Sequence, residues 1–357
     1  MEYSITKNDI NIEISDPDNI IIFNKKYNIH TQILDLHNKQ LSTLPTEFCN
    51  LINLKTIYFF DNRLSSLPVA INNLINLQCL NLESNQLSSL PTAICNLINL
   101  KTLYLQSNQL SSLPTAISNL INLQTLNLCY NQLSSLPKEI CNLINLQILY
   151  LSHNQLSSLS EEICNLINLK KLYLQENQLS SLPTTIGKLI NLQKIYLSYN
   201  QLSSLPTVIT NLINLQELKI RNNKLSSLPA TIGDLINLQY LDLSHNQLTA
   251  LPTTIANLIN LYGLYLHNNK LTSLPAEILN IKKIIHINET SYEINNLDIE
   301  CTILIFTELK INIGNLPINI KEVWLNNRIK KPNIKLPFRC EIKIYESAVI
   351  TFKNYNY

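Results

Sequence analysis

Apolar residues recur along this chain in one regular pattern. From Leu51 to Asn280 the pattern LINLQxLxLxxNxLSSLPxxIxN occurs ten times in register, and residues 28–50 form a degenerate copy. We count repeat positions from the first Leu of each copy. Positions 7 and 9 are apolar, whereas positions 6, 8 and 10 are mostly polar. This alternation predicts a short, half-buried strand in every repeat, and the fixed period predicts stacked units.

The remainder of each repeat returns the chain to the next strand. Apolar residues at positions 14, 17, 21, 1 and 4 have spacings that suit short 3₁₀ or helical turns. Pro at position 18 cannot donate a ladder hydrogen bond, so it begins the return. Ser160 replaces this Pro once, and residues 160–162 favour a short helical turn there. The sequence therefore predicts an α/β solenoid with a parallel β-sheet on its concave face and 3₁₀ or helical turns on its convex side.

Position 12 is Asn in all ten regular copies, from Asn62 to Asn269. Each turn of a solenoid leaves backbone groups facing inward, where water cannot satisfy them. A side-chain amide has both donors and an acceptor, so it can pair with such groups in its own repeat and in the neighbouring one. We interpret these asparagines as structural.

The motif LxxLxLxxNxLxxLPxxI resembles the intracellular, LP-type leucine-rich-repeat family, which includes Ras-scaffold and Ras-suppressor proteins. The resemblance covers residues 28–280. It implies a leucine-rich-repeat horseshoe that acts as a protein-binding scaffold, and by resemblance alone it suggests a small GTPase or a phosphatase as partner. The high content of Ile, Asn, Lys and Tyr is similar to that of leucine-rich-repeat proteins of amoeba-infecting giant viruses.

The two ends of the chain fall outside the regular repeats. We expect residues 1–27 to form an N-terminal cap. Residues 281–357 lose the repeat register but keep short β-like runs, which we interpret as degenerate repeats and a C-terminal cap. A small separate domain is the alternative for this segment.

Composition narrows the class of protein. The chain is 45% apolar, which predicts a buried core. Its net charge is only +2, so we expect no nucleic-acid partner. We find no secretory signal and no membrane-spanning run in the sequence. The eight cysteines do not cluster at the termini, which favours reduced thiols. We therefore expect an intracellular, cytoplasmic protein, located in the host cytoplasm or the virion if it is viral.

No catalytic motif is present. The six histidines lack metal-binding spacing, and the four glycines form no phosphate-binding loop, so we expect no enzyme activity, no cofactor and no metal. An alternative is an enzyme-linked effector of the ubiquitin-ligase type, which needs a substantial catalytic domain with a reactive cysteine. Only the short segment 281–357 follows the repeats, and it contains Cys301 and Cys340.

Outward strand positions vary between copies, which is how a uniform scaffold acquires a specific surface. Six of the ten residues at position 8 are Tyr, and on consecutive repeats such rings can stack into a strip suited to an interface. Charged residues accompany them in the repeats spanning 143–257. The predicted partner-binding residues on the concave face are Tyr150, Tyr173, Tyr196, Tyr199, Lys171, Lys194, Lys219, Arg221, Tyr240 and Asp242. The alternative is a solvated face without a specific partner.

Position 2 is Ile in all ten copies, where the resembled family usually has a polar residue. Outward-pointing Ile side chains would form an apolar stripe and a means of self-association, which makes a self-assembling structural protein an alternative function. The interpretation that we favour is partial burial of these side chains between repeats.

Overall fold

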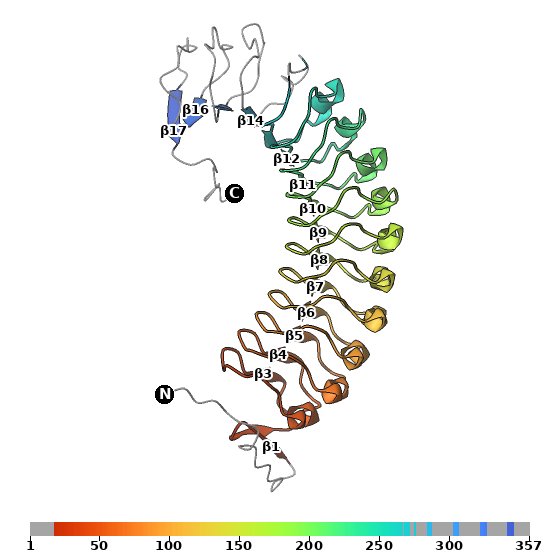
Figure 1. Ribbon diagram of the computed structural model, residues 1–357, viewed down its shortest axis with the longest axis vertical. Coiled ribbons are helices and arrows are strands. Elements are labelled where there is room, and N and C mark those ends of the chain that lie inside the picture. Colours follow the sequence, from red (N-terminus) through yellow and green to blue (C-terminus); the bar gives the residue numbers. More distant parts are fainter. Residues whose placement is uncertain are drawn as a thin grey trace. The chain divides into compact units, whose positions relative to one another are not determined.

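The protein is described from a computed structural model. The structure describes residues 18–266, 268–271 and 275. It also describes the backbone of strands at 284–287, 303–306, 322–326 and 341–345. The chain divides into two compact units, residues 1–156 with 165–169 and residues 157–164 with 170–357. We call them the N-terminal and the C-terminal unit. Figure 1 shows strands on one side of each unit and 3₁₀ helices on the other.

The N-terminal unit begins with an antiparallel hairpin and continues as a parallel sheet. The hairpin pairs β1 (Asn19–Ile22) with β2 (Lys25–Asn28). The parallel strands are β3 (Ile33–Asp35), β4 (Thr56–Tyr58), β5 (Cys79–Asn81), β6 (Thr102–Tyr104), β7 (Thr125–Asn127) and β8 (Ile148–Tyr150). Alternating with them are the 3₁₀ helices η1 (Thr46–Asn50), η2 (Val69–Asn73), η3 (Thr92–Asn96), η4 (Thr115–Asn119) and η5 (Lys138–Asn142), and η6 (Glu161–Asn165) follows β8.

The C-terminal unit repeats this arrangement. Its regular strands are β9 (Lys171–Tyr173), β10 (Lys194–Tyr196), β11 (Glu217–Lys219), β12 (Tyr240–Asp242) and β13 (Gly263–Tyr265). Its 3₁₀ helices are η7 (Ile186–Lys188), η8 (Thr207–Asn211), η9 (Ile232–Asp234) and η10 (Thr253–Asn257). The parallel sheet continues through β14 (Ile284–Ile287), β15 (Ile303–Phe306), β16 (Glu322–Asn326) and β17 (Glu341–Tyr345).

The stretch of chain between paired residues shortens after β13. Lys194 pairs with Glu217, one full repeat later, whereas Ile284 already pairs with Ile303. The last four strands coincide with the β-like runs of the sequence, so residues 281–357 include shorter repeats in the same sheet. The other residues of this segment, and most of the predicted N-terminal cap at 1–27, lie outside the described residues. The predicted domain boundaries therefore stay predictions.

The repeated Leu and Ile side chains form the core. In the repeat that begins at Leu97, the apolar side chains at positions 1, 4, 7, 9, 14 and 21 have no exposed surface. Each fully buried Leu or Ile contributes about 1.5–3 kcal/mol of stabilisation. Within each unit a strand residue pairs in register with its equivalent in the next repeat, so identical side chains pack against one another.

The predicted asparagine ladder is confirmed by its hydrogen bonds. The side-chain oxygen of Asn108 accepts a hydrogen bond from the backbone N–H of Leu87 at 3.0 Å. Its amide group donates to the carbonyl oxygens of Leu82, at 2.9 Å, and Leu105, at 3.1 Å. The side chain is only 8% exposed, so these bonds satisfy groups that water cannot reach. Equivalent bonds recur in both units.

Proline begins the return segment in most repeats, as predicted. Pro114 has an extended backbone and immediately precedes η4. Where Ser160 replaces Pro, η6 still begins at the next residue, Glu161.

Six cysteines between Cys49 and Cys164 are free thiols. Burial raises the pKa of Cys95 to about 11 and, together with the charge of Glu47, raises that of Cys49 to about 12, so these two thiols stay protonated and poorly reactive.

Candidate protein-binding face

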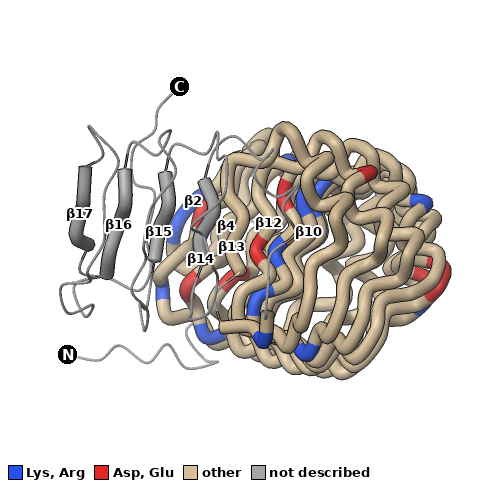
Figure 2. Tube along the Cα trace, turned by 90° about the horizontal axis from the view of Figure 1, so that it is seen from above, with Lys and Arg blue, Asp and Glu red and all other residues tan. Residues whose placement is uncertain are grey.

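The outward residues of β9 to β12 form two rows in the C-terminal unit. In each of these strands the middle residue is buried and its two neighbours point outward and are half-buried. Parallel pairing aligns Lys171, Lys194, Glu217 and Tyr240 in one row and Tyr173, Tyr196, Lys219 and Asp242 in the other. We call these eight side chains, with Tyr199 and Arg221 beside them, the strand face. Figure 2 shows charged residues near β10 and β12 in an otherwise mostly uncharged trace.

Glu217 is the centre of a hydrogen-bonded cluster on this face. Its side chain is 15% exposed, and one carboxylate oxygen lies 2.5 Å from Nζ of Lys194. The hydroxyl of Tyr196 donates a hydrogen bond to the other oxygen, which lies 3.5 Å from Nζ of Lys219. Two lysines therefore surround one carboxylate, and the cluster has a net positive charge.

The environment of this cluster fixes its protonation. Burial by itself would raise the pKa of Glu217, but the hydrogen bonds from Lys194 and Tyr196 and the charge of Lys219 outweigh it and lower that pKa. Burial and the hydrogen bond to Glu217 raise the pKa of Tyr196 far above its ordinary value. At neutral pH the carboxylate is thus ionised and the phenol protonated, so the cluster is fixed in structure and charge.

Tyrosine rings line the face, but in a different geometry from that expected. The rings of Tyr173 and Tyr196 meet edge to face, with centroids 4.9 Å apart and an interplanar angle of 89°, instead of stacking in parallel. Tyr240 stacks on Tyr262, at the edge of the next repeat, with centroids 6.2 Å apart. Gly263 leaves room for the rings of Tyr240 and Tyr265, since a Cβ there would lie 3.2 Å and 3.0 Å from them.

Two cations of the strand face have no carboxylate partner among the described residues. Lys171 forms no ion pair within the described part of the chain. Arg221 contacts Nε2 of His245 at 3.3 Å, while its own Nε is buried without a hydrogen-bond partner. Burial and the nearby Arg221 lower the pKa of His245, so the imidazole is neutral at pH 7 and does not compete for an anion. Each of these two cations could pair with a separate carboxylate of a ligand.

Tyr199 lies at the edge of the face in a strained backbone conformation. It occupies repeat position 11, with φ of 58°, and its side chain is 46% exposed. This left-handed region is unfavourable for a bulky residue and readily accepts Asn, which occupies the next repeat as Asn222. The same backbone conformation recurs at position 11 of the other regular repeats, so it belongs to the repeat fold.

The structure thus groups nine of the ten predicted binding residues within the C-terminal unit, and no finding tests their role. Tyr150 is the tenth. It lies in β8 of the N-terminal unit, where it too occupies an outward, half-buried position.

The isoleucines at position 2 are exposed, so the expectation that they are partly buried between repeats is wrong. Each has about half or more of its side chain exposed, from 50% at Ile98 to 66% at Ile259. The reason is local. Positions 1 and 4 on either side are fully buried leucines, and the turn that directs both inward directs position 2 outward.

A second asparagine ladder, at position 3, was not foreseen from the sequence. The amide group of Asn99 donates to the carbonyl oxygen of Ile75, at 2.8 Å, and Asn214 and Asn237 form the same bond with Ile190 and Ile213. The ten identical asparagines at this position were a visible signal.

The described residues contain no cluster of His, Cys, Asp or Glu suited to a metal ion. They also contain no helix that is long and apolar enough to cross a membrane.

Known protein families match most of the repeat array. The family described as "Leucine-rich repeat region" matches residues 207–311. The family described as "Leucine rich repeat" matches four overlapping segments between residues 98 and 225, and a further leucine-rich-repeat family matches residues 76–97. The solved structure of a leucine-rich-repeat protein from Leptospira interrogans is 30% identical, with a TM-score of 0.68, over 88% of this chain and 95% of that one.

The chain belongs to the leucine-rich repeat family. The comparisons confirm the predicted leucine-rich-repeat solenoid. The leucine-rich repeats of FLRT2, solved in an octameric complex with Latrophilin 3 and Unc5D, are 30% identical over 67% of this chain and 76% of that one, with a TM-score of 0.58. An internalin from Listeria monocytogenes is 24% identical over 70% of this chain and 72% of that one, with a TM-score of 0.62, and shares the fold.

Leucine-rich-repeat domains are protein-interaction modules and are usually non-catalytic. No enzyme domain was found in this chain by comparison. No match was found among curated proteins. Cys301 and Cys340, on which the ligase alternative depends, lie outside the described residues.

Proposed function

We propose that this leucine-rich repeat protein is a non-catalytic scaffold whose strand face binds an acidic segment of a partner protein. The observation that carries the proposal is the pair of cations, Lys171 and Arg221, for which the described part of the chain supplies no carboxylate partner. They flank the Glu217 cluster and the outward-pointing tyrosine rings. Tyrosine and arginine are enriched among residues that dominate binding energy, and an acidic segment complements the positive charge of this face.

Charge reversal tests the face. The full chain carrying Lys171→Glu and Arg221→Glu is compared with the unchanged protein in cross-linking and pull-down from cell lysate, with bound proteins identified by mass spectrometry. We expect at least one partner to be lost from the double variant, and its recovery from the unchanged protein to fall with added salt. The matched control is Lys101→Glu with Lys138→Glu, which makes the same charge change elsewhere. If every partner binds the double variant as well as the control, the strand face is the wrong surface.

The same experiment addresses the finer proposals on partner and location. The LP-type resemblance favours a small GTPase or a phosphatase as the captured protein. That resemblance and the buried, protonated thiols of Cys49 and Cys95 support action in the cytoplasm, while the viral origin rests on composition alone. Imaging of the tagged full chain in the cell, and proteomics of purified virions, test these locations. A chain found only at the cell surface contradicts them.

The exposed isoleucines favour self-association as a second function. Ile190, Ile213, Ile236 and Ile259 project at one repeat position of the C-terminal unit, and a row of identical residues can pair with the same row of a second copy. Sedimentation at increasing concentration measures this. We expect Ile190→Lys with Ile213→Lys to shift the protein toward monomer, whereas Ser203→Lys with Ser226→Lys, which adds the same charge at exposed serines, leaves association unchanged. An unchanged protein that stays monomeric at high concentration excludes this function.

A further inference from the structure

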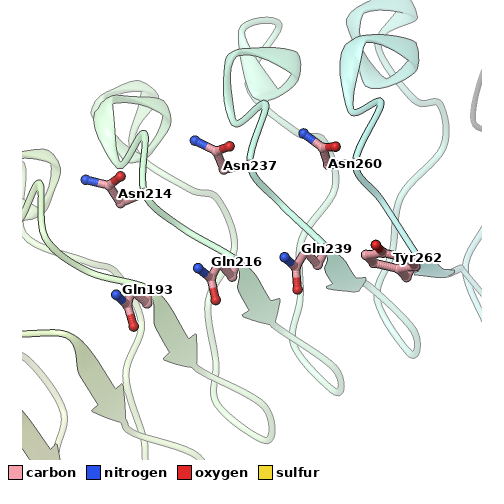
Figure 3. Close-up of a pocket in the computed structure, with 7 residues that line it drawn as sticks. All are labelled: Gln193, Asn214, Gln216, Asn237, Gln239, Asn260 and Tyr262. Atoms are coloured by element: carbon pink, nitrogen blue, oxygen red, sulfur yellow. The ribbon is translucent and has the colours of Figure 1, made fainter. Parts of the chain in front are cut away.

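A neutral groove runs along one flank of the C-terminal unit, next to the strand face. Its volume is about 360 Å³, and its lining is almost entirely polar. Figure 3 shows two rows of carboxamide side chains along it, with an aromatic ring at one end. The lining residues are Gln193, Gln216 and Gln239 at repeat position 5, Asn214, Asn237 and Asn260 at position 3, and Tyr262.

The glutamines of this groove retain their full hydrogen-bonding capacity. The side chains of Gln193, Gln216 and Gln239 form no hydrogen bond within the described residues, although each is half-buried. A carboxamide offers two donors and one acceptor that accepts twice. Three such groups on successive repeats therefore present a regular series of unused donors and acceptors.

The asparagines are fixed in place by the second ladder. The amide groups of Asn214, Asn237 and Asn260 each donate to an Ile carbonyl oxygen of the preceding repeat at 2.8 Å. Their side-chain oxygens accept no hydrogen bond within the described part of the chain, so they are held as acceptors toward the groove. Because these side chains are already ordered, a ligand loses little entropy in using them.

The chemistry of the lining selects a neutral ligand rich in hydroxyl or amide groups. None of the seven lining residues is charged, so the groove offers no cation to pair with a phosphate or a carboxylate. Tyr262 is 43% exposed and is supported from behind by Tyr240. Polar amides beside an exposed ring suit a sugar, whose hydroxyls pair with the amides while its C–H face packs on the aromatic ring.

The spacing of the amide rows separates an oligosaccharide from a peptide. Successive repeats place equivalent amides about 4.8 Å apart, the spacing of neighbouring strands. An extended peptide advances about 3.3 Å per residue, so its residues do not keep the spacing of the amides. An extended chain of β-linked six-membered sugar rings advances by about one ring length per unit, which is close to the strand spacing.

We propose that the groove lined by Gln193, Gln216, Gln239 and Tyr262 binds a neutral, extended β-linked oligosaccharide, one sugar ring per repeat. The groove and the proposed protein-binding face share no residue, although they adjoin where Tyr262 stacks on Tyr240. Each of the two sites can therefore fail without the other.

Isothermal titration of the full chain with cellotetraose and with tetra-N-acetylchitotetraose tests the proposal. We expect saturable binding of at least one of them with Kd in the millimolar range or tighter. The variant Gln216→Ala with Gln239→Ala should weaken it about tenfold or more, because it removes two of the three carboxamides that offer unused donors and acceptors. Tyr262→Ala should weaken it by a similar factor. The half-buried glutamines have no side-chain partner, so the double variant should keep the thermal midpoint of the unchanged protein.

The matched control is Gln78→Ala with Gln124→Ala, the same change at the same repeat position on either side of Lys101. It should bind as the unchanged protein does. Maltotetraose, whose α-linkages curve the chain, should bind at least fivefold more weakly than the better β-linked probe. The proposal is overturned by absence of binding with both β-linked probes, by equal weakening in the control, or by maltotetraose binding equally well.

Discussion

The ammonium group of Lys219 lies over the ring of Tyr196, with Nζ 4.2 Å from the ring centroid, and donates a hydrogen bond to the hydroxyl of that same residue at 3.0 Å. Tyr196 in turn donates to Glu217. One tyrosine thus connects a cation and a carboxylate on the paired strands β10 and β11. The ring is ordered before a partner arrives, which lowers the entropic cost of binding at this face.

Glu217→Gln should destabilise the protein by about 1–2 kcal/mol at pH 7, because it removes the charge that compensates two partly exposed lysines. The folded-state pKa of Glu217 is lower than its unfolded value, so the stabilisation is present above the unfolded pKa and is lost as the pH falls through the folded pKa. Denaturant unfolding at pH 7, 5 and 3 measures it. We expect the difference between the two proteins to shrink below about pH 4.

The control for this prediction is Glu139→Gln, at a glutamate without a described side-chain partner. It should change the free energy of unfolding by less than about 0.5 kcal/mol. A difference between the unchanged protein and Glu217→Gln that stays constant from pH 7 to pH 3 contradicts the assigned cause.

Asn108→Ala should destabilise the N-terminal unit by about 2–4 kcal/mol. The change leaves a buried N–H of Leu87 and the buried carbonyl oxygens of Leu82 and Leu105 without this partner. Asn99→Ala is the matched comparison, since Asn99 is exposed and donates one described bond. It should cost about 0.5–1 kcal/mol. If denaturant unfolding gives the two variants equal losses of stability, burial of the first ladder does not add to the free energy of unfolding.

Gly233→Ala should cost about 1–3 kcal/mol, because the added Cβ would lie 2.0 Å from the carbonyl oxygen of Thr254, a backbone atom that cannot move alone. Gly263→Ala is the control. The three atoms nearest to its Cβ belong to the side chains of Tyr265 and Tyr240, which can shift. Neither glycine has a positive φ, so conformation does not distinguish them. Thermal unfolding should rank Gly233→Ala as the less stable variant.

Tyr199→Asn should stabilise the protein by about 0.5 kcal/mol while weakening the partner bound at the strand face. Asn tolerates the left-handed backbone at φ of 58° better than Tyr does. The reciprocal change, Asn222→Tyr, places a ring at φ of 52° and should destabilise by a similar amount. Stability is measured by unfolding and partner affinity by titration. A Tyr199→Asn variant that is less stable than the unchanged protein shows that packing of this ring outweighs strain.

Much of the fold follows from periodicity. The repeating pattern placed the strands at positions 6 to 8, the buried leucines around them and the hydrogen-bonding role of the asparagines such as Asn108. These features depend on which side of the backbone a residue faces, and alternation in sequence determines that. The pattern also placed Tyr196, Lys194 and Lys219 on one outward face, because parallel in-register pairing aligns equivalent residues of successive repeats.

Periodicity did not determine how side chains meet once they are aligned. The sequence allowed Tyr173 and Tyr196 to stack in parallel, yet they meet edge to face. It placed Glu217 beside the face without showing that two lysines and a tyrosine converge on its carboxylate. Side-chain rotamers and burial decide such contacts, and they depend on neighbours from other repeats.

The sequence by itself determined the repeat, the buried side of each strand and the outward position of the tyrosines, because each follows from a local alternation copied along the chain. Only the tertiary structure decided that Ile98 and its equivalents are exposed, and that Gln216 and Asn237 line one groove. Positions 2 and 3 lie in the turn between the buried leucines at positions 1 and 4, and position 5 lies between that turn and the strand. No simple alternation assigns a side to these positions, so the path of the backbone fixes their direction.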